Sequence, residues 1–184
     1  MILGDVEIKR LIQLGLTDSA IHVGPASVDI RLGNTFLIPK RKRGGVKLGE
    51  EIRYTRREIG NAEYFPLKPG QFVLATTWES VDLPANVAAF VQGRSSIGRA
   101  GLTIQNAGFV DPGFFGHITL ELVNESPNTI WLKPGYRVGQ LVFMQCTDVA
   151  NPYDGKYNGQ VEATGSRMHA DPEGVASQEV TADA

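Results

Sequence analysis

The chain has 184 residues, of which 42% are hydrophobic and 21% charged, with a formal net charge of −2. Such a composition predicts a soluble globular protein with one sizeable core, and the charge argues against a nucleic-acid-binding protein. No apolar run approaches the roughly 20 residues of a membrane span, no signal peptide is recognisable, and the single cysteine, Cys146, excludes an internal disulfide, which favours a cytoplasmic location.

Residues 5–14 are predicted to form a short N-terminal helix. Asp5 can cap its first turn, and Gly15 can end it. Three apolar residues share one face at helical spacing: Ile8, Leu11 and Ile12. We therefore expect this helix to pack against the rest of the protein.

Residues 26–33 alternate apolar and polar side chains, which predicts a half-buried strand. The basic run at 40–45 could meet a phosphate, but a short charge run more often forms a solvated loop. The polar residues 46–63 have little periodicity, so we expect irregular structure there with one short strand.

The second half of the chain has the pattern of an all-β protein. Apolar strands are predicted at 72–75, 87–91 and 138–144. The sequence Leu-Lys-Pro-Gly occurs at 67–70 and again at 132–135, and Pro-Gly suits a type II turn. Short strands separated by turns indicate a sandwich or barrel.

Residues 108–122 combine a turn rich in Gly and Pro with an alternating strand. Asp111 lies on the turn, and Glu121 lies on the polar face of the strand, so the two carboxylates can share one site. The core face is expected to hold Ile118, Leu120 and Leu122. The alternative is a solvated strand with an ordinary exposed glutamate.

Residues 93–99 (GRSSIGR) suit an anion. Two glycines let backbone N–H groups converge, two hydroxyls add donors, and two guanidiniums supply positive charge. The segment lacks the Gly-Lys-Ser/Thr of a P-loop, and a purely structural turn is the alternative.

Residues 151–168 form a glycine-punctuated arm with little core material. Lys156, Gln160 and Arg167 could close over the same anion as a flexible lid. Residues 169–184 are small and acidic without aromatic side chains, so we expect a disordered tail.

Two further observations concern the ligand. Gln105 and Asn106 can offer paired donors and acceptors to a planar heterocycle. One cysteine, no Cys-x-x-Cys motif and three histidines make a zinc site improbable. The sequence thus predicts a phosphorylated, ring-bearing ligand beside two carboxylates.

Five motifs in order resemble the dCTP deaminase family: 25–33 (PASVDIRLG), 93–99 (GRSSIGR), 107–121 (AGFVDPGFFGHITLE), 139–141 (GQL) and 156–160 (KYNGQ). The similarity covers residues 1 to about 168, which we expect to form one domain including the arm. It implies the mostly β, distorted jelly-roll or β-sandwich of the dUTPase superfamily, and a homotrimer with active sites at subunit interfaces.

The resemblance also implies roles for individual residues. Glu121 matches the catalytic general base, with Asp111 as the second catalytic carboxylate. The triphosphate-binding motif corresponds to Arg94, Ser95, Ser96, Ile97, Gly98 and Arg99. Other nucleotide-contact positions are Asp111, Thr119, Leu120, Glu121, Gln140, Tyr153, Lys156 and Gln160. The implied partners are dCTP and dUTP with Mg²⁺ carried by the triphosphate, dTTP as an inhibitor, and no zinc.

The form of residues 104–111 (IQNAGFVD) is similar to bifunctional members that convert dCTP to dUMP. Gly165 stands where many relatives have proline, so the resemblance does not fix how the arm closes. A monofunctional dCTP deaminase, a dUTPase alone, and a trimeric dNTP-binding sensor without catalysis are the alternatives.

Overall fold

The computed structural model describes residues 1–17, 22–104 and 107–172, and most of the ordered elements are strands. The helical elements are α1 (Asp5–Gln13), α2 (Ser95–Gly98) and the 3₁₀ turn η1 (Met168–Ala170). The strands are β1 (Val28–Pro39), β2 (Tyr54–Glu58), β3 (Phe65–Leu67), β4 (Phe72–Asp82), β5 (Val87–Gly93), β6 (Leu102–Ile104), β7 (Phe109–Val110), β8 (Phe115–Asn124), β9 (Ile130–Leu132) and β10 (Arg137–Gln145). The predicted mostly β fold with a short N-terminal helix is confirmed.

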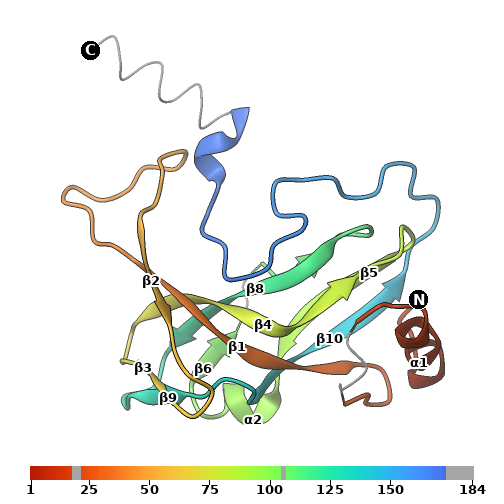
Figure 1. Ribbon diagram of the computed structural model, residues 1–184, viewed down its shortest axis with the longest axis horizontal. Coiled ribbons are helices and arrows are strands. Elements are labelled where there is room, and N and C mark those ends of the chain that lie inside the picture. Colours follow the sequence, from red (N-terminus) through yellow and green to blue (C-terminus); the bar gives the residue numbers. More distant parts are fainter. Residues whose placement is uncertain (18–21, 105–106, 173–184) are drawn as a thin grey trace.

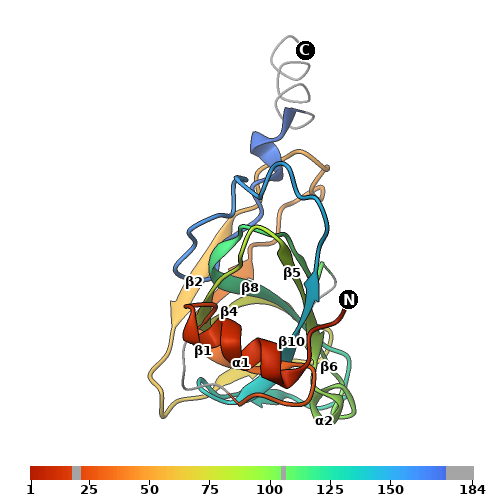
Figure 2. The same ribbon diagram turned by 90° about the vertical axis from the view of Figure 1, so that its right-hand side faces the viewer.

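Within the described residues, eight strands form one antiparallel sheet in the order β6-β8-β4-β1-β10-β5-β7, with β2 also paired to β1 (Figure 1). The first part of β1 pairs with β10, and the rest pairs with β4 and β2. Register shifts interrupt β1 between Ile30 and Arg31 and between Leu32 and Phe36. Because irregular pairing bends a strand, the sheet curls over on itself (Figure 2).

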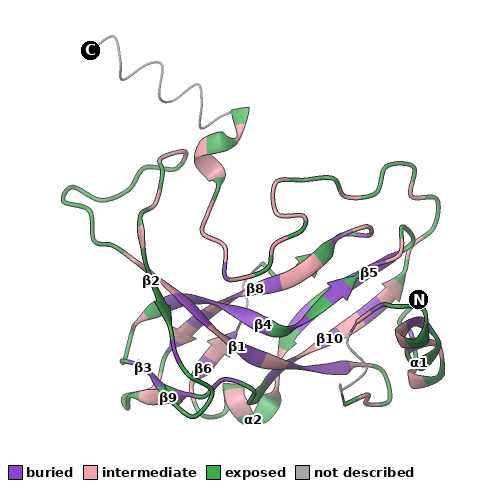
Figure 3. Ribbon diagram, in the orientation of Figure 1, coloured by how far each residue is buried: buried purple, intermediate pink, exposed green. Residues whose placement is uncertain are grey.

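The core lies inside this curl, where the central strands are the most buried (Figure 3). In β8, Ile118, Leu120 and Leu122 are buried, whereas Thr119 and Glu121 on the other face are only partly buried. The predicted alternation of β8 is therefore confirmed. One face of the strand anchors it, and the other is available to the candidate site.

Helix α1 packs through Ile8 and Leu11, as predicted, and Gly15 follows its end with a φ of 99°. The expected cap by Asp5 is wrong. Gly4 is the N-cap, and Asp5 lies in the first turn, where its carboxylate accepts a hydrogen bond from Lys9 Nζ (2.7 Å). That bond lowers the pKa of Asp5. No helix among the described residues is long and apolar enough to cross a membrane.

The strands extend further than their sequence pattern predicts. β1 continues to Pro39 and β4 to Asp82, because each pairs on both sides with neighbours distant in the sequence. β2 is the single short strand expected in 46–63, and 40–45 is an exposed loop, as predicted.

Both Leu-Lys-Pro-Gly turns are confirmed by Gly70 (φ 71°) and Gly135 (φ 77°), whose backbone conformation suits glycine. They follow β3 and β9, two short strands that pair with each other and that the sequence pattern did not predict. The repeated turn therefore ends two neighbouring strands of one small sheet.

We predict that Asn124→Ala lowers the free energy of unfolding by about 2–4 kcal/mol, because several buried hydrogen bonds lose their partner. Asn124 is fully buried and donates to the carbonyls of Leu67 and Asn128 (both 2.8 Å). It also accepts from the N–H of Ser126 (2.9 Å). Urea unfolding measures the loss, and exposed Asn128→Ala is the control. Equal stability of the two variants would contradict the prediction.

Candidate active site

A cavity of about 590 Å³ lies between β8, β2 and the arm, and we call it the arm cavity. Its walls are formed by Ile52, Tyr54, Phe72, Leu74, Ala107, Phe109, Val110, Asp111, Phe114, Ile118, Thr119, Glu121, Tyr153, Tyr157, Gln160, Thr164, Gly165 and Ser166. Both carboxylates singled out in the sequence, Asp111 and Glu121, line it. Its size is that of a small-molecule pocket, and its polar groups are few and converge from different elements.

The chain positions the two carboxylates in different ways. Asp111 directly follows β7, at a turn where the Phe114 N–H donates to the Asp111 carbonyl (3.2 Å) and buried Phe114 anchors the loop. Glu121 lies on β8, paired in register with Leu74 of β4. A turn residue and a strand residue thus meet in one cavity, as the sequence predicted for residues 108–122.

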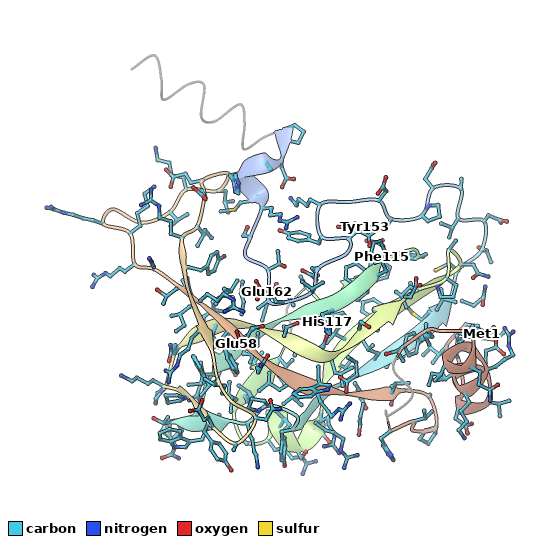
Figure 4. All side chains as sticks on the ribbon, viewed as in Figure 1. Met1, Glu58, Phe115, His117, Tyr153 and Glu162 are labelled. Carbon is cyan, nitrogen blue, oxygen red and sulfur yellow. The ribbon has the colours of Figure 1, made fainter. Side chains whose placement is uncertain are left out.

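The arm runs alongside β8 and covers this cavity. Phe115 and His117 mark the segment of β8 beside the arm in Figure 4. Gly159 N–H donates to the Phe115 carbonyl, and His117 N–H donates to the Gln160 carbonyl (both 2.8 Å). These main-chain bonds hold the arm in the manner of a short extra strand.

Side chains strengthen this attachment. Thr119 Oγ1 donates to Gln160 Oε1 (3.2 Å) and accepts from the Thr164 N–H (3.0 Å). Two residues predicted to contact a nucleotide, Thr119 and Gln160, therefore touch each other at the cavity wall. Tyr153, a third, also lines the cavity, and its N–H donates to the Pro112 carbonyl (2.8 Å).

The two cations of the arm do not line this cavity. Lys156 forms an ion pair with Asp171, whose hydrogen bond raises the pKa of Lys156. Arg167 donates to the Lys156 carbonyl and lies over the ring of Tyr157, 5.9 Å from its centroid. Both predicted phosphate ligands are thus held within residues 156–171 in this structure.

A second cavity of about 390 Å³ lies beside α2, and we call it the turn cavity. Its lining residues are His22, Gly24, Pro25, Ser27, Asp29, Gly93, Arg94, Ser95, Ser96 and Gln140. It therefore gathers four residues expected to bind the nucleotide: Arg94, Ser95, Ser96 and Gln140. Gly98 and Arg99 are exposed beside it, and Ile97 packs against the core.

Asp29 orders the positive charge at the turn cavity. Its carboxylate accepts from Arg137 Nη1 (2.8 Å) and lies 3.6 Å from Arg94 Nε. Asp29 is largely buried, so the pair is less screened by water than a surface pair. Ser27 Oγ donates to Gln140 Oε1 (3.2 Å), which orients a second polar side chain.

The predicted site residues therefore fall into two groups. None of the described residues lines both cavities, and α2 lies at the bottom of Figure 1 and Figure 2, whereas the arm runs above β8. Leu120 differs from the rest, since its side chain is fully buried in the core and only its backbone is left to contact a ligand. Gln105 and Asn106 lie outside the described residues.

The sequence analysis did not identify two residues that line the cavities, Tyr54 and Asp29. Tyr54 of β2 lines the arm cavity, and its Oη accepts from the Ser166 N–H (3.2 Å). No motif marks Tyr54, because it lies in the weakly patterned residues 46–63. Asp29 is visible in the sequence only as a polar position on an alternating strand.

Fold and site together define a curled β-sheet protein whose pocket pairs two carboxylates beneath a carboxy-terminal arm. The chain belongs to the dCTP deaminase-like family, whose model matches residues 2–146. The resemblance noted in the sequence is thereby confirmed. Residues 1–17, 22–104 and 107–172 contain no cluster of three or more His, Cys, Asp or Glu side chains suited to a metal ion.

Named relatives agree with this assignment. The chain is 46% identical over 178 residues to a dCTP deaminase, dUMP-forming, of Sulfurihydrogenibium sp. (strain YO3AOP1), covering 93% of this chain and 99% of the relative. It is 44% identical over 180 residues to the protein of that name from Aquifex aeolicus (strain VF5), covering 94% and 98%.

A solved structure shares the fold. The crystal structure of 2'-deoxycytidine 5'-triphosphate deaminase from Agrobacterium tumefaciens matches with a TM-score of 0.60 and 25% identity. The match covers 77% of this chain and 47% of that longer chain.

We predict that Thr119→Val loosens the arm, because valine keeps the shape of threonine but makes neither hydrogen bond. Exchange of the Gly159 and His117 amides, whose own partners are unaltered, should accelerate about tenfold. Hydrogen exchange followed by mass spectrometry measures this. Thr103→Val on β6 is the control, and unchanged arm exchange in Thr119→Val would refute the prediction.

Proposed function

We propose that this protein is a hydrolase that deaminates dCTP and then converts the product to dUMP and pyrophosphate. The observation that carries the proposal is that Glu121 and Asp111 line one cavity beneath the arm. The two relatives named above are dUMP-forming dCTP deaminases, and each aligns with nearly all of this chain. Such an enzyme supplies dUMP for thymidylate synthesis, and we propose that it works in the cytoplasm.

In the first reaction, Glu121 acts as the general base. It accepts a proton from water, whose oxygen attacks C4 of the cytosine, and it then delivers the proton toward the leaving amino group, so that dCTP and water give dUTP and ammonia. Other nucleobase deaminases activate this water on zinc. A positioned carboxylate contributes about 10²–10⁴-fold, so hydrogen-bond donors that stabilise charge at the base must add to it.

In the second reaction, Asp111 orients a water toward the α-phosphate. Water adds to that phosphorus as the α–β bond breaks, so that dUTP and water give dUMP and pyrophosphate. The phosphates are proposed to bind Arg94, Ser95, Ser96 and Arg99, whose guanidiniums and hydroxyls suit phosphate oxygens. Backbone groups at Ile97 and Gly98 complete this motif, and Gln140 lies beside it.

Mg²⁺ is proposed to arrive on the triphosphate, because phosphate oxygens and water are its preferred ligands. When bound, it reduces the negative charge on the phosphates. We propose that the phosphates and water hold the ion, with no direct ligand from the protein. The other nucleotide contacts are proposed at Thr119, Leu120, Tyr153, Lys156 and Gln160.

A homotrimer would join the two cavities. The phosphate motif and the carboxylates line separate cavities of one chain, and one nucleotide would meet both if the turn cavity of one copy faced the arm cavity of another. Exposed Phe90 and Phe109, whose rings lie 5.1 Å apart, give a surface suited to such contact.

One assay separates the candidate functions. Purified protein is incubated with dCTP and Mg²⁺, and the products are resolved. Ammonia with dUMP and pyrophosphate supports the proposal; ammonia with dUTP means a monofunctional deaminase; unchanged dCTP with hydrolysed dUTP means a dUTPase; tight binding without turnover means a dNTP sensor. Adding dTTP to the same assay tests its predicted inhibition.

We predict that Glu121→Gln lowers kcat for ammonia release about 10²–10⁴-fold, because the amide cannot accept the proton. Binding of a non-hydrolysable dCTP analogue should change only a few-fold, since shape and polarity are retained. Steady-state kinetics and calorimetry measure the two quantities. Exposed Glu125→Gln is the control. Near-normal ammonia release by Glu121→Gln would exclude it as the base.

We predict that two inactive variants complement each other in mixed oligomers. Arg94→Ala and Glu121→Gln, each inactive alone, should give about one quarter of the wild-type activity when co-expressed at equal levels. In a randomly mixed closed oligomer, about one half of the subunits supply an intact Arg94, and about one half of their neighbours supply an intact Glu121. Differently tagged subunits allow mixed oligomers to be purified. Activity that stays at the level of the single variants would show that both residues act within one chain.

A further inference from the structure

The arm is attached to the body of the protein unevenly along its length. Its first part is held by two main-chain bonds to β8, to which the side chains of Asn158 and Gln160 each add a hydrogen bond. Its last part, residues 163–166, depends on side-chain acceptors: Thr35 for Ala163, Thr119 for Thr164 and Tyr54 for Ser166. Among the described residues, Ser166 is the last one of the arm to hydrogen-bond outside residues 151–172.

Tyr54 holds this last point in two ways. Its hydroxyl accepts from the Ser166 N–H (3.2 Å), and its ring packs closely against Gly165. A Cβ at Gly165 would lie 2.6 Å from Cε2 and 2.9 Å from Cδ2 of that ring, so any side chain there must displace the ring. Glycine at 165 is therefore matched to tyrosine at 54.

The location of Tyr54 gives this contact a consequence for the reaction. Tyr54, Gly165 and Ser166 form part of the wall of the arm cavity, which also contains Asp111 and Glu121. A nucleotide deaminated at Glu121 can therefore meet Asp111 without leaving, as long as the arm stays closed. If the arm opens first, the deaminated triphosphate escapes before water cleaves its α–β bond.

We propose that Tyr54 is a positioning residue that keeps the arm closed between the two reactions, and that it thereby sets the share of dUTP that escapes instead of becoming dUMP. This inference rests on the proposed bifunctional activity. Tyr54 takes no proton and touches no reacting atom in this role. It acts through the arm, and the product ratio is what it changes.

The test compares Tyr54→Phe, which loses only the hydroxyl, with Tyr64→Phe, an exposed tyrosine near β3 that serves as the control. Free dUTP as a share of total product should rise about fivefold in Tyr54→Phe, the factor expected for one lost hydrogen bond. Exchange of the Ala163 and Thr164 amides, whose own acceptors are unaltered, should accelerate by a similar factor. Thermal unfolding of both variants checks that they fold.

A second comparison tests the matched pair. Gly165→Ala should raise the share of free dUTP in the wild-type background but have little further effect in Tyr54→Ala, where no ring is displaced. Equal effects of Gly165→Ala in both backgrounds would overturn the proposed contact.

The outcomes separate this inference from the function on which it rests. Faster exchange in Tyr54→Phe with an unchanged product ratio overturns the control of product escape, and unchanged exchange overturns the positioning role itself. If the wild-type protein forms no dUMP, the bifunctional activity and the control of escape both fail. Faster exchange in Tyr54→Phe would then still support the positioning of the arm.

Discussion

Gly116 lets the arm lie against β8, because its φ of 124° and its missing Cβ leave room for the main chain of Gln160. A Cβ there would lie 2.6 Å from the Gln160 carbonyl oxygen, a separation that backbone atoms cannot relieve cheaply. The hydrogen bonds from Gly159 N–H to the Phe115 carbonyl and from His117 N–H to the Gln160 carbonyl follow from this approach. Without it the arm cavity would lack one wall, and its two carboxylates would face open water.

Charge is arranged differently at the turn cavity and in the arm. At the turn cavity, Asp29 holds the guanidiniums of Arg94 and Arg137 in place, so that little rotamer freedom remains to be lost when a phosphate binds. In the arm, Lys156 has Asp171 as its partner, and an incoming anion must replace that carboxylate. Under the proposed function, a phosphate would meet cations already ordered by Asp29 at the turn, whereas in the arm it would have to replace Asp171.

Local patterns predicted the parts of the fold that depend on neighbouring residues. Alternation along β8 separates Leu120 from Glu121, and Pro-Gly marks the turns at Gly70 and Gly135, because side-chain direction and φ are properties of a few residues. The pairing of β3 with β9 and the length of β1 depend on partners distant in the sequence, so they were not visible. Tyr54 escaped notice for the same reason, since its meaning comes from Gly165, more than a hundred residues along the chain. The family motifs named the residues of the candidate site, and the structure divides them between two cavities.

That division constrains the enzyme as a whole. Under the proposed function, one nucleotide meets Arg94 at the turn cavity and the carboxylates at the arm cavity, and no described residue lines both cavities. Under the proposed homotrimer, several copies would form the site together. Residues such as Phe109, which lines the arm cavity and is half exposed, would then serve the pocket and the contact between copies together. Under that arrangement, the arm closes on a substrate that two chains already hold, and its attachment at Tyr54 governs release without having to supply the affinity.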